Sequence, residues 1–473
     1  MLIKLSFDFE FFSVARFQFL GKLGWYVNVG PSGFFPCLSN RFIVAVNRTI
    51  FLNYEVNRTF QNRSWHNLVF KRYMELVAGY PYWLIKTGLL YQYPKLVENA
   101  KCEAAIIGGG ISGALTAYHL INAGVDCILV DGRTIGLGST SASTSLLQYE
   151  LDIPLHKLKK VTGEYRAIRA YQLCGEAIDK MIALMKDIGF SDFHKSKSLF
   201  FSTYPHQKMF LQQECVARKE AGFQVESVSR EEMKKQFNLE AAYGILSEQG
   251  ATNNAYALTH EILQFCQRKG LRVFDRTKIE RIDYHKDQVT LRTGENCVIT
   301  ADYLVNAAGY EAVNYIEKGI VDLDCTYAII SESQAESKEI WEEKVMMWNT
   351  DDPYLYLSVH NDNRIAVGGR DERFVNVKTL HHHLEKKADL LEKDFNKLFP
   401  RIPFKKEFSW SGVFGKTKDS LPYIGYYPKT PRTLYALGFG GNGITFSLVA
   451  AEIITDLITG RKNQNAELFS FSR

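Results

Sequence analysis

The chain lacks the usual marks of an exported or membrane-spanning protein. No stretch of its 473 residues reaches 18 consecutive apolar positions, and Asp8 and Glu10 interrupt the segment where an export signal needs an apolar core. The eight cysteines include no CxxC pair, so the usual spacings of a zinc site are missing. We therefore expect a cytoplasmic protein with reduced thiols, no membrane span and no metal site.

A concentrated basic face is also missing from most of the chain. The net charge is +5, but residues 1–73 contain nine Lys or Arg and only three Asp or Glu. The remaining residues are therefore close to neutral, and we expect no nucleic acid as a partner. With 46% hydrophobic and 23% charged residues, the composition suits a globular protein of two or three domains.

Residues 1–73 differ from the rest in composition. They hold 12 of the 31 phenylalanines and show little helical or strand periodicity. Our interpretation is that Met74 is the true start and that residues 1–73 are upstream sequence joined to the reading frame. The alternative is a genuine N-terminal extension that binds a partner.

The stretch AAIIGGGISGALTAYHL, residues 104–120, is typical of a dinucleotide-binding turn. The strand expected at about 103–107 runs into Gly108, Gly110 and Gly113, which have the spacing GxGxxG. Gly108 permits the tight turn, Gly110 lets the backbone approach a pyrophosphate, and Gly113 lets the following helix pack on the sheet. That helix, at about 111–123, directs its N-terminus, with Ile111 and Ser112, at the phosphates.

A buried second strand is expected at 125–131, and it ends on an acid. Asp131 follows Gly113 by 18 residues and is placed to accept hydrogen bonds from the adenosine ribose hydroxyls. Gly132 and Arg133 continue the predicted cofactor site. The turn alone does not separate NAD from FAD, because both cofactors present the same ADP end.

Three later segments favour FAD over NAD. Residues 136–152 form a loop of small hydroxyl residues that suits close approach to a pyrophosphate and a flavin ring. Residues 298–310 form a strand that runs into small residues, after a helix at about 257–269 and an antiparallel meander at about 276–293 that brings Ile279 to the adenine. Residues 434–460 run from a strand through glycines into an apolar helix, whose N-terminal N–H groups would stabilise an anionic reduced ring. The cofactor residues predicted in these segments are Thr140, Ser141, Ser143, Ala308, Gly309, Gly440, Gly441, Asn442, Gly443 and Ile444.

Together these stretches resemble the D-amino-acid oxidase/glycine oxidase family of FAD-dependent oxidoreductases, over about residues 74–460. The resemblance implies a mixed α/β (α+β) fold, with a three-layer Rossmann-type FAD domain interrupted by a mixed-sheet substrate domain. The FAD domain would comprise 101–155, 239–324 and 407–460, and the substrate domain 156–238 and 325–406. Within 325–374, a hairpin is expected around residues 361–363. Some relatives tether FAD through a cysteine in the segment corresponding to the 410s. Because this chain has no cysteine after Cys325, non-covalent FAD is expected.

The resemblance also implies a reaction, which is oxidation of a C–N bond in an amine or amino acid by hydride transfer to flavin N5. Many relatives carry an arginine for the substrate carboxylate two residues after the glycine that corresponds to Gly412, whereas this chain has Phe414. A larger or differently anchored amine is therefore favoured. Arg370 and Lys416 are candidate replacements for that arginine, and Tyr354 and Tyr356 are further pocket candidates; no catalytic acid or base is assigned.

Several alternatives stay open at the level of the sequence. The substrate could be another CH–NH or CH–OH compound, or FAD could be bound without catalysis. An NAD dehydrogenase of Rossmann type is less favoured, because it would not explain the glycines at 438–443. The electron acceptor, dioxygen or another compound, is left unknown, and so is the oligomeric state.

Overall fold

The computed structural model describes residues 76–316, 319–334 and 344–473, together with the backbone of seven short strands between residues 16 and 55. The chain divides into two units, Met1–Tyr73 and Met74–Arg473. The short strands of the first unit pair antiparallel; they are β1 (Arg16–Phe19), β2 (Trp25–Asn28), β3 (Phe34–Pro36), β4 (Arg41–Phe42), β5 (Ala45–Val46), β6 (Thr49–Ile50) and β7 (Tyr54–Glu55). Translation from Met74 stays a prediction.

Eight strands of the second unit form one sheet. They are β9 (Ala100–Ile107), β10 (Cys127–Val130), β17 (Arg272–Phe274), β18 (Ile279–Tyr284), β19 (Val289–Thr293), β20 (Val298–Asn306), β26 (Tyr423–Tyr426) and β27 (Thr433–Leu437). The pairs β17–β10, β10–β9, β9–β20 and β20–β27 are parallel, while β18, β19 and β26 join antiparallel. A parallel core of this kind is the Rossmann-type arrangement that was predicted.

The first crossover of this sheet follows directly from local sequence. Helix α2 (Ile111–Asn122) buries Ala114, Leu115, Ala117 and Leu120 at helical spacing, so one face of it packs in the core. It contacts α8 (Ala255–Arg268) and α10 (Gly443–Ile458), whose residues are largely buried. The helices predicted at 111–123 and 257–269 are confirmed within two residues at each end.

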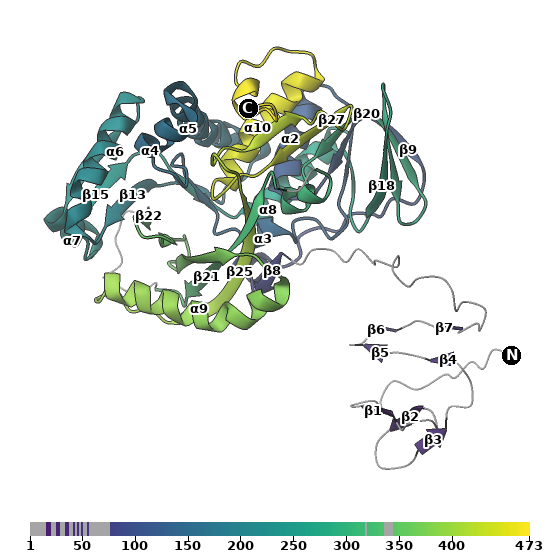
Figure 1. Cartoon of the computed structure of the whole chain (residues 1–473), viewed down its shortest axis with the longest axis horizontal. Helices are drawn as coiled ribbons and strands as arrows, with labels where there is room; N and C mark the ends of the chain where they lie inside the picture. Colours follow the sequence, from purple (N-terminus) through teal and green to yellow (C-terminus); the bar gives the residue numbers. More distant parts are fainter. Residues whose placement is uncertain are drawn as a thin grey trace. The chain divides into compact units, whose positions relative to one another are not determined.

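A second sheet of nine strands lies beside the first in the same unit (Figure 1). Its order is β14 (Val225–Ser229), β15 (Tyr243–Ser247), β13 (Lys197–Ser202), β22 (Val345–Asn349), β23 (Tyr356–Val359), β24 (Ile365–Arg373), β21 (Asp322–Ser331), β25 (Lys406–Lys416) and β8 (Val77–Gly79). Strands β23 and β24 form the predicted hairpin, with Val359 opposite Ile365. Smaller strands β11 (Leu146–Leu147), β16 (Ala251–Asn253) and β12 (Phe193–Lys195) pair separately.

The two faces of this nine-stranded sheet are distinct. One face carries α9 (Val377–Leu398), which runs across β21, β24, β25 and β8 (Figure 1). Tyr327 and Val413 pack in the core beneath α9. The opposite face carries Trp410 and Gly412, which approach Ala142 of the loop that follows β10. We call this second side the inner face. The remaining helices are α1 (Tyr82–Thr87), α3 (Ser139–Ala142), α4 (Leu155–Thr162), α5 (Glu164–Ile188), α6 (Lys208–Glu220) and α7 (Arg230–Phe237).

Two segments assigned to the FAD domain supply strands to the nine-stranded sheet. Strand β15 lies within 239–324 and β25 largely within 407–460, yet both pair with strands of the segments assigned to the substrate domain. Strand β8, which precedes every predicted segment, extends the same sheet through its pairing with β25. The sheet therefore takes strands from segments assigned to both domains and from β8 ahead of them, and the domain division stays a prediction.

A group of charges is buried between α6 and the sheet. The side chains of Arg218, Glu214 and Glu150 have no exposed surface. Arg218 Nε donates to Glu214 at 2.7 Å, and Arg218 Nη1 lies 3.2 Å from Glu150. Burial alone would raise the pKa of Glu214, but Arg218 and His156 outweigh it and lower that pKa to about 2. The cluster therefore depends on the guanidinium, because the two carboxylates have no solvent to stabilise them.

We expect Arg218→Met to lower the free energy of unfolding by about 3–5 kcal/mol, because it leaves two buried carboxylates without their cation. The control is Lys180→Met, which breaks the exposed ion pair with Glu452 (2.8 Å) and should cost less than about 1 kcal/mol. Urea unfolding followed by circular dichroism measures both. Equal losses in the two variants would contradict the structural role given to Arg218.

Candidate functional site

The predicted glycine turn is a place where backbone segments meet without side chains between them. Gly108 has φ +111°, and a Cβ atom there would lie 2.4 Å from the Ala307 carbonyl oxygen. A Cβ at Gly113 would lie 1.8 Å from the Gly108 carbonyl oxygen, and one at Gly110 would lie 2.8 Å from Thr140 Oγ1. The turn thus needs glycine at all three positions, and it lies against two of the three later segments predicted to contact the cofactor.

Asp131 stands at the carboxyl end of β10 and faces the same turn. Its carboxylate accepts hydrogen bonds from the N–H groups of Gly109 and Arg133, both at 2.7 Å. Burial raises the pKa of Asp131, while the two N–H donors act in the opposite direction. The next residues, Gly132 and Arg133, continue past the turn, and Arg133 forms an ion pair with Glu311 (2.7 Å). A ribose contact by Asp131 stays a prediction.

The hydroxyl-rich loop is fastened to the glycine turn. Thr140 Oγ1 accepts from the Ile111 N–H at 3.0 Å, so the loop lies over the first residue of α2. Ser141 Oγ donates to a backbone carbonyl within the loop (2.9 Å), and Ser143 Oγ accepts from the N–H two residues later (3.0 Å). The loop is therefore held in a defined conformation, because its side chains form hydrogen bonds with backbone N–H and carbonyl groups.

Two tryptophans bind the backbone of the hydroxyl-rich loop. The indole N–H of Trp83, on α1, donates to the Ser143 carbonyl at 2.7 Å. The indole N–H of Trp410, on β25, donates to the Ala142 carbonyl at 2.8 Å. Trp83 and Trp410 are both 2% exposed. Because α1 precedes the glycine-turn strand, a segment ahead of the predicted FAD domain helps to position the hydroxyl-rich loop.

The C-terminal glycines join the same region. The Gly440 N–H donates to the Gly415 carbonyl (2.9 Å), and the Gly441 N–H donates to Asp152 Oδ2 (3.1 Å). Asn442 Nδ2 donates to the backbone carbonyls of residues 148 and 150, at 3.0 and 2.8 Å. A Cβ at Gly441 would lie 2.6 Å from an Asp152 oxygen. The turn ahead of α10 is therefore bonded to the last residues of the hydroxyl-rich loop, 148–152.

The remaining predicted cofactor residues lie close to these segments. Ser112 Oγ is 2.6 Å from Ser447 Oγ, which joins α2 to α10. Gly443 and Ile444 begin α10, and Ile444 is buried. Ala308 and Gly309 follow β20; Ala308 packs in the same small core as Ile279, the first residue of β18. The residues present fit FAD: a cradle lacking Cβ atoms, a helix N-terminus and an acid at the end of β10 converge.

The two tyrosines nominated for the pocket meet an aspartate that sequence reasoning did not select. Tyr354 Oη donates to Asp152 Oδ1 at 3.2 Å, and the rings of Tyr354 and Tyr356 are 5.8 Å apart. Tyr356 Oη is 3.1 Å from Thr326 Oγ1. Burial raises the pKa of Asp152, although the Gly441 N–H and the charge of Lys416 oppose the rise. These side chains therefore join the inner face to the C-terminal glycine turn.

Phe414 and Lys416 also point to the inner face. They follow Gly412 at strand spacing, and Gly412 faces Ala142. Phe414 is buried, and Lys416 Nζ lies 5.1 Å from the centre of its ring. Lys416 also forms an ion pair with Asp324 across the strands (2.8 Å). The cation nominated as a substrate anchor therefore already has a carboxylate partner.

Arg370, the other nominated anchor, is directed away from this site. Its guanidinium forms two hydrogen bonds with Asp394 of α9, at 2.5 and 2.7 Å, on the opposite face of the sheet. The cause is a β-bulge between β21 and β24, where residues 369–372 oppose residues 325–327. Gly369 and Arg370 have φ of +139° and +59° there. The extra residue reverses the alternation, so that Arg370 faces α9 and Asp371 faces inward.

Sequence reasoning missed Asp371 and Asp152, and only one of them had a usable signal. Asp371 follows a nominated residue directly, so considering both faces of the strand would have included it. One Asp371 oxygen, Oδ1, is buried and has no hydrogen-bond partner among the described residues. Burial raises the pKa of Asp371 to about 6, while the hydroxyl of Thr326 lowers it. Asp152 had no signal beyond its place at the end of the loop.

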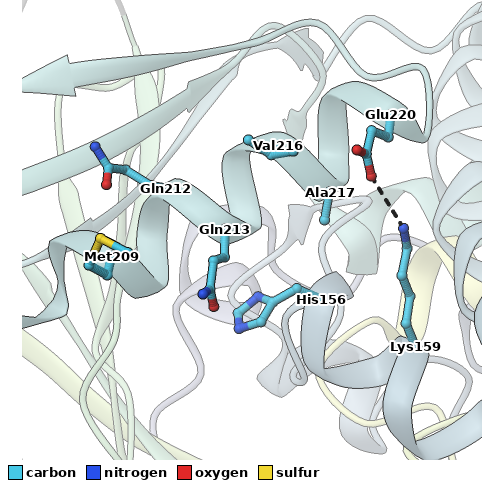
Figure 2. A pocket seen from close by; sticks show the side chains of 8 residues that line it. All are labelled: His156, Lys159, Met209, Gln212, Gln213, Val216, Ala217 and Glu220. Carbon is cyan, nitrogen blue, oxygen red and sulfur yellow. Dashed lines mark ion pairs between the residues drawn. The ribbon is translucent and has the colours of Figure 1, made fainter.

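An open depression elsewhere on the surface, of about 400 Å³, lies between α4 and α6. Figure 2 shows its lining, which includes His156 and the ion pair between Lys159 and Glu220 (3.7 Å). None of its lining residues is among those predicted for the cofactor or the substrate.

The comparisons agree with this geometry. The sequence model of a family described as "DAO: FAD dependent oxidoreductase" matches residues 103–457, so the chain belongs to that family. It is 24% identical to glycine oxidase from Bacillus licheniformis over 390 residues, which cover 78% of this chain and 97% of that one. It is 22% identical to gamma-glutamylputrescine oxidoreductase from Escherichia coli, over 78% of this chain and 86% of the relative.

A solved structure shows the same fold. The crystal structure of glycine oxidase from Geobacillus kaustophilus matches with a TM-score of 0.64 and 18% identity, over 79% of this chain and 99% of that chain. The predicted family, the mixed α/β fold of Rossmann type, the FAD cofactor and the assignment as an enzyme are confirmed. Segment 76–99, with β8 and α1, lies ahead of the residues that the family model matches. No described helix has the length and apolar character to cross a bilayer.

We expect Gly113→Ala to weaken FAD binding by more than about tenfold, because its Cβ would overlap the Gly108 carbonyl and force the turn open. The matched control is Gly294→Ala, whose Cβ would meet only the end of the Glu280 side chain, at 3.2 Å. FAD fluorescence titration of the apoproteins measures affinity, and circular dichroism checks the fold. Unchanged affinity in a folded Gly113→Ala protein would contradict the assignment of the turn.

Proposed function

We propose that this enzyme oxidises the carbon–nitrogen bond of an amine, with hydride passing from the α-carbon of the substrate to N5 of FAD. The support is chemical: the inner face of the nine-stranded sheet meets the glycine turns and carries tyrosines, carboxylates and an apolar ring. The relatives are named as an oxidase of glycine and an oxidoreductase of gamma-glutamylputrescine, so both names refer to nitrogen compounds.

The bond changes set what the protein must supply. The C–H bond breaks and its electron pair leaves as hydride, while the lone pair of the nitrogen forms the C=N bond. The nitrogen must therefore have lost its extra proton before the hydride leaves. FAD, when bound, supplies the hydride acceptor. The protein's contribution is to orient the substrate, to exclude water and to favour negative charge at the N-terminus of α10, beside Gly443.

An amine substrate, rather than a simple α-amino acid, is supported by one observation: among the described residues, no cation without a carboxylate partner lies at the centre of the inner face. Phe414 stands where many relatives have arginine, Arg370 is paired with Asp394 behind the sheet, and Lys416 is paired with Asp324. A substrate carboxylate would there face Asp152 and Asp371, and like charges repel. Phe414 would instead contact an apolar part of the substrate.

We expect the FAD-loaded protein, purified from Met74, to lose its flavin absorption anaerobically when suitable amines are added. Glycine and other α-amino acids should bleach it more slowly than amines of similar size, because their carboxylate lacks a partner. Stopped-flow absorbance measures the rates. Faster reduction by α-amino acids would contradict the amine preference, and a flavin that no nitrogen compound reduces would contradict the proposed activity itself.

A further inference from the structure

We propose that Asp371 binds a second, non-reacting ammonium group of the substrate, so that the enzyme prefers amines with two cationic nitrogens. This inference rests on the proposed function, which supplies the reacting carbon and nitrogen. It adds the chemical class of the substrate and the residue that selects it.

The first observation is the direction of Asp371. Its two neighbours, Arg370 and Glu372, bond to groups of the α9 side: Arg370 to Asp394, and Glu372 to Tyr327 and His383. The bulge turns the residue between them to the inner face. A bulge beside a site commonly changes the direction of one side chain. Here it places an aspartate on the inner face, where regular alternation would place Arg370.

The second observation is that Asp371 keeps one oxygen, Oδ1, to which no described residue bonds, although the Thr326 hydroxyl bonds to the same carboxylate. Asp324 is paired with Lys416, and the two oxygens of Asp152 accept from Tyr354 and the Gly441 N–H. A buried oxygen with no partner among the described residues is costly unless a ligand satisfies it. An ammonium group offers three donors and a positive charge, and it satisfies such an oxygen directly.

The chemistry of the reaction decides which nitrogen Asp371 holds. A carboxylate next to an amine stabilises the protonated form, whereas the reacting nitrogen must be neutral to form the C=N bond. Asp371 would therefore inhibit the reaction if it bound that nitrogen. Binding a different nitrogen, at the other end of the substrate, orients the molecule without this cost.

The ionisable groups around Asp371 predict how binding changes with pH. They are Asp152, Asp324, Lys416, Tyr354 and Tyr356, with Arg373 at the exposed end of β24 opposite Asp324. Burial raises the pKa of Asp371 to about 6, so the carboxylate forms as the pH rises through that value. Affinity for a dication should rise over the same interval.

The test compares Asp371→Asn with the wild-type holoenzyme on straight-chain α,ω-diamines and on monoamines of equal length. We expect the wild type to have the lower KM for diamines. The variant should raise the diamine KM at least about tenfold, with little change for monoamines, because one charged contact is lost. Asp371→Glu should restore part of the preference. The control is Asp389→Asn, an exposed acid on α9 that pairs with Lys406, which should change nothing.

A second readout separates binding from folding. FAD content and the flavin spectrum should be the same in Asp371→Asn and the wild type. Because the pKa of Asp371 is raised from 3.8 to about 6 in the folded state, stability is lost as the pH rises through this interval, and the full loss remains above about pH 6. The variant should therefore melt at a higher temperature than the wild type at pH 8, with a smaller difference at pH 5.

Three outcomes would overturn the inference. One is an unchanged diamine KM in a variant that retains its FAD; another is an equal rise for diamines and monoamines. The third is a wild type reduced only by α-amino acids or monoamines, which leaves the proposed C–N oxidation standing. If no amine or amino acid reduces the flavin, the proposed function fails instead.

Discussion

The structure depends on the close approach of backbone segments at one glycine turn. Gly108 touches the backbone at Ala307, Gly113 touches Gly108, and Gly110 leaves room only for the Thr140 hydroxyl. Any side chain there would separate β9 from β20 or lift α2 from the sheet. Because the hydroxyl-rich loop is bonded to the start of α2 and the C-terminal helix is bonded to α2 through Ser447, the rest of the site takes its position from this contact.

The sequence alone predicted those parts of the site whose structure is determined by residues close together in the chain. The strand, turn and helix from Ala100 to Asn122 follow from an apolar run, three spaced glycines and helical periodicity. The hairpin of β23 and β24 follows from turn residues between two apolar stretches. In each case the determining residues lie in one continuous stretch of the chain, so no knowledge of the tertiary fold was needed.

The parts that sequence alone did not predict depend on distant pairings. Strand β8 is only three residues long, and its partner residues in β25 lie 331 to 335 positions later in the chain. The inward direction of Asp371 depends on a β-bulge, which arises from a register shift in the pairing of β24 with β21. Regular alternation along β24, counted from Gly368, would place Arg370 on the inner face. Only the register shift places Asp371 there instead. Residue spacing alone therefore could not predict that the inner face presents the negative charge of Asp371.

The proposed preference for amines over amino acids rests on two features of the inner face that act in the same direction. Phe414 stands in place of a cation that would attract a carboxylate, and the bulge brings in an anion that repels one. Burial raises the pKa of Asp371 to about 6, so its ionised form lowers the stability of the folded protein, and its Oδ1 atom has no hydrogen-bond partner among the described residues. Asn would fill the same space without that charge. A group that is unfavourable for folding, placed by a strained bulge and aimed at a cofactor site, is best explained by what it binds.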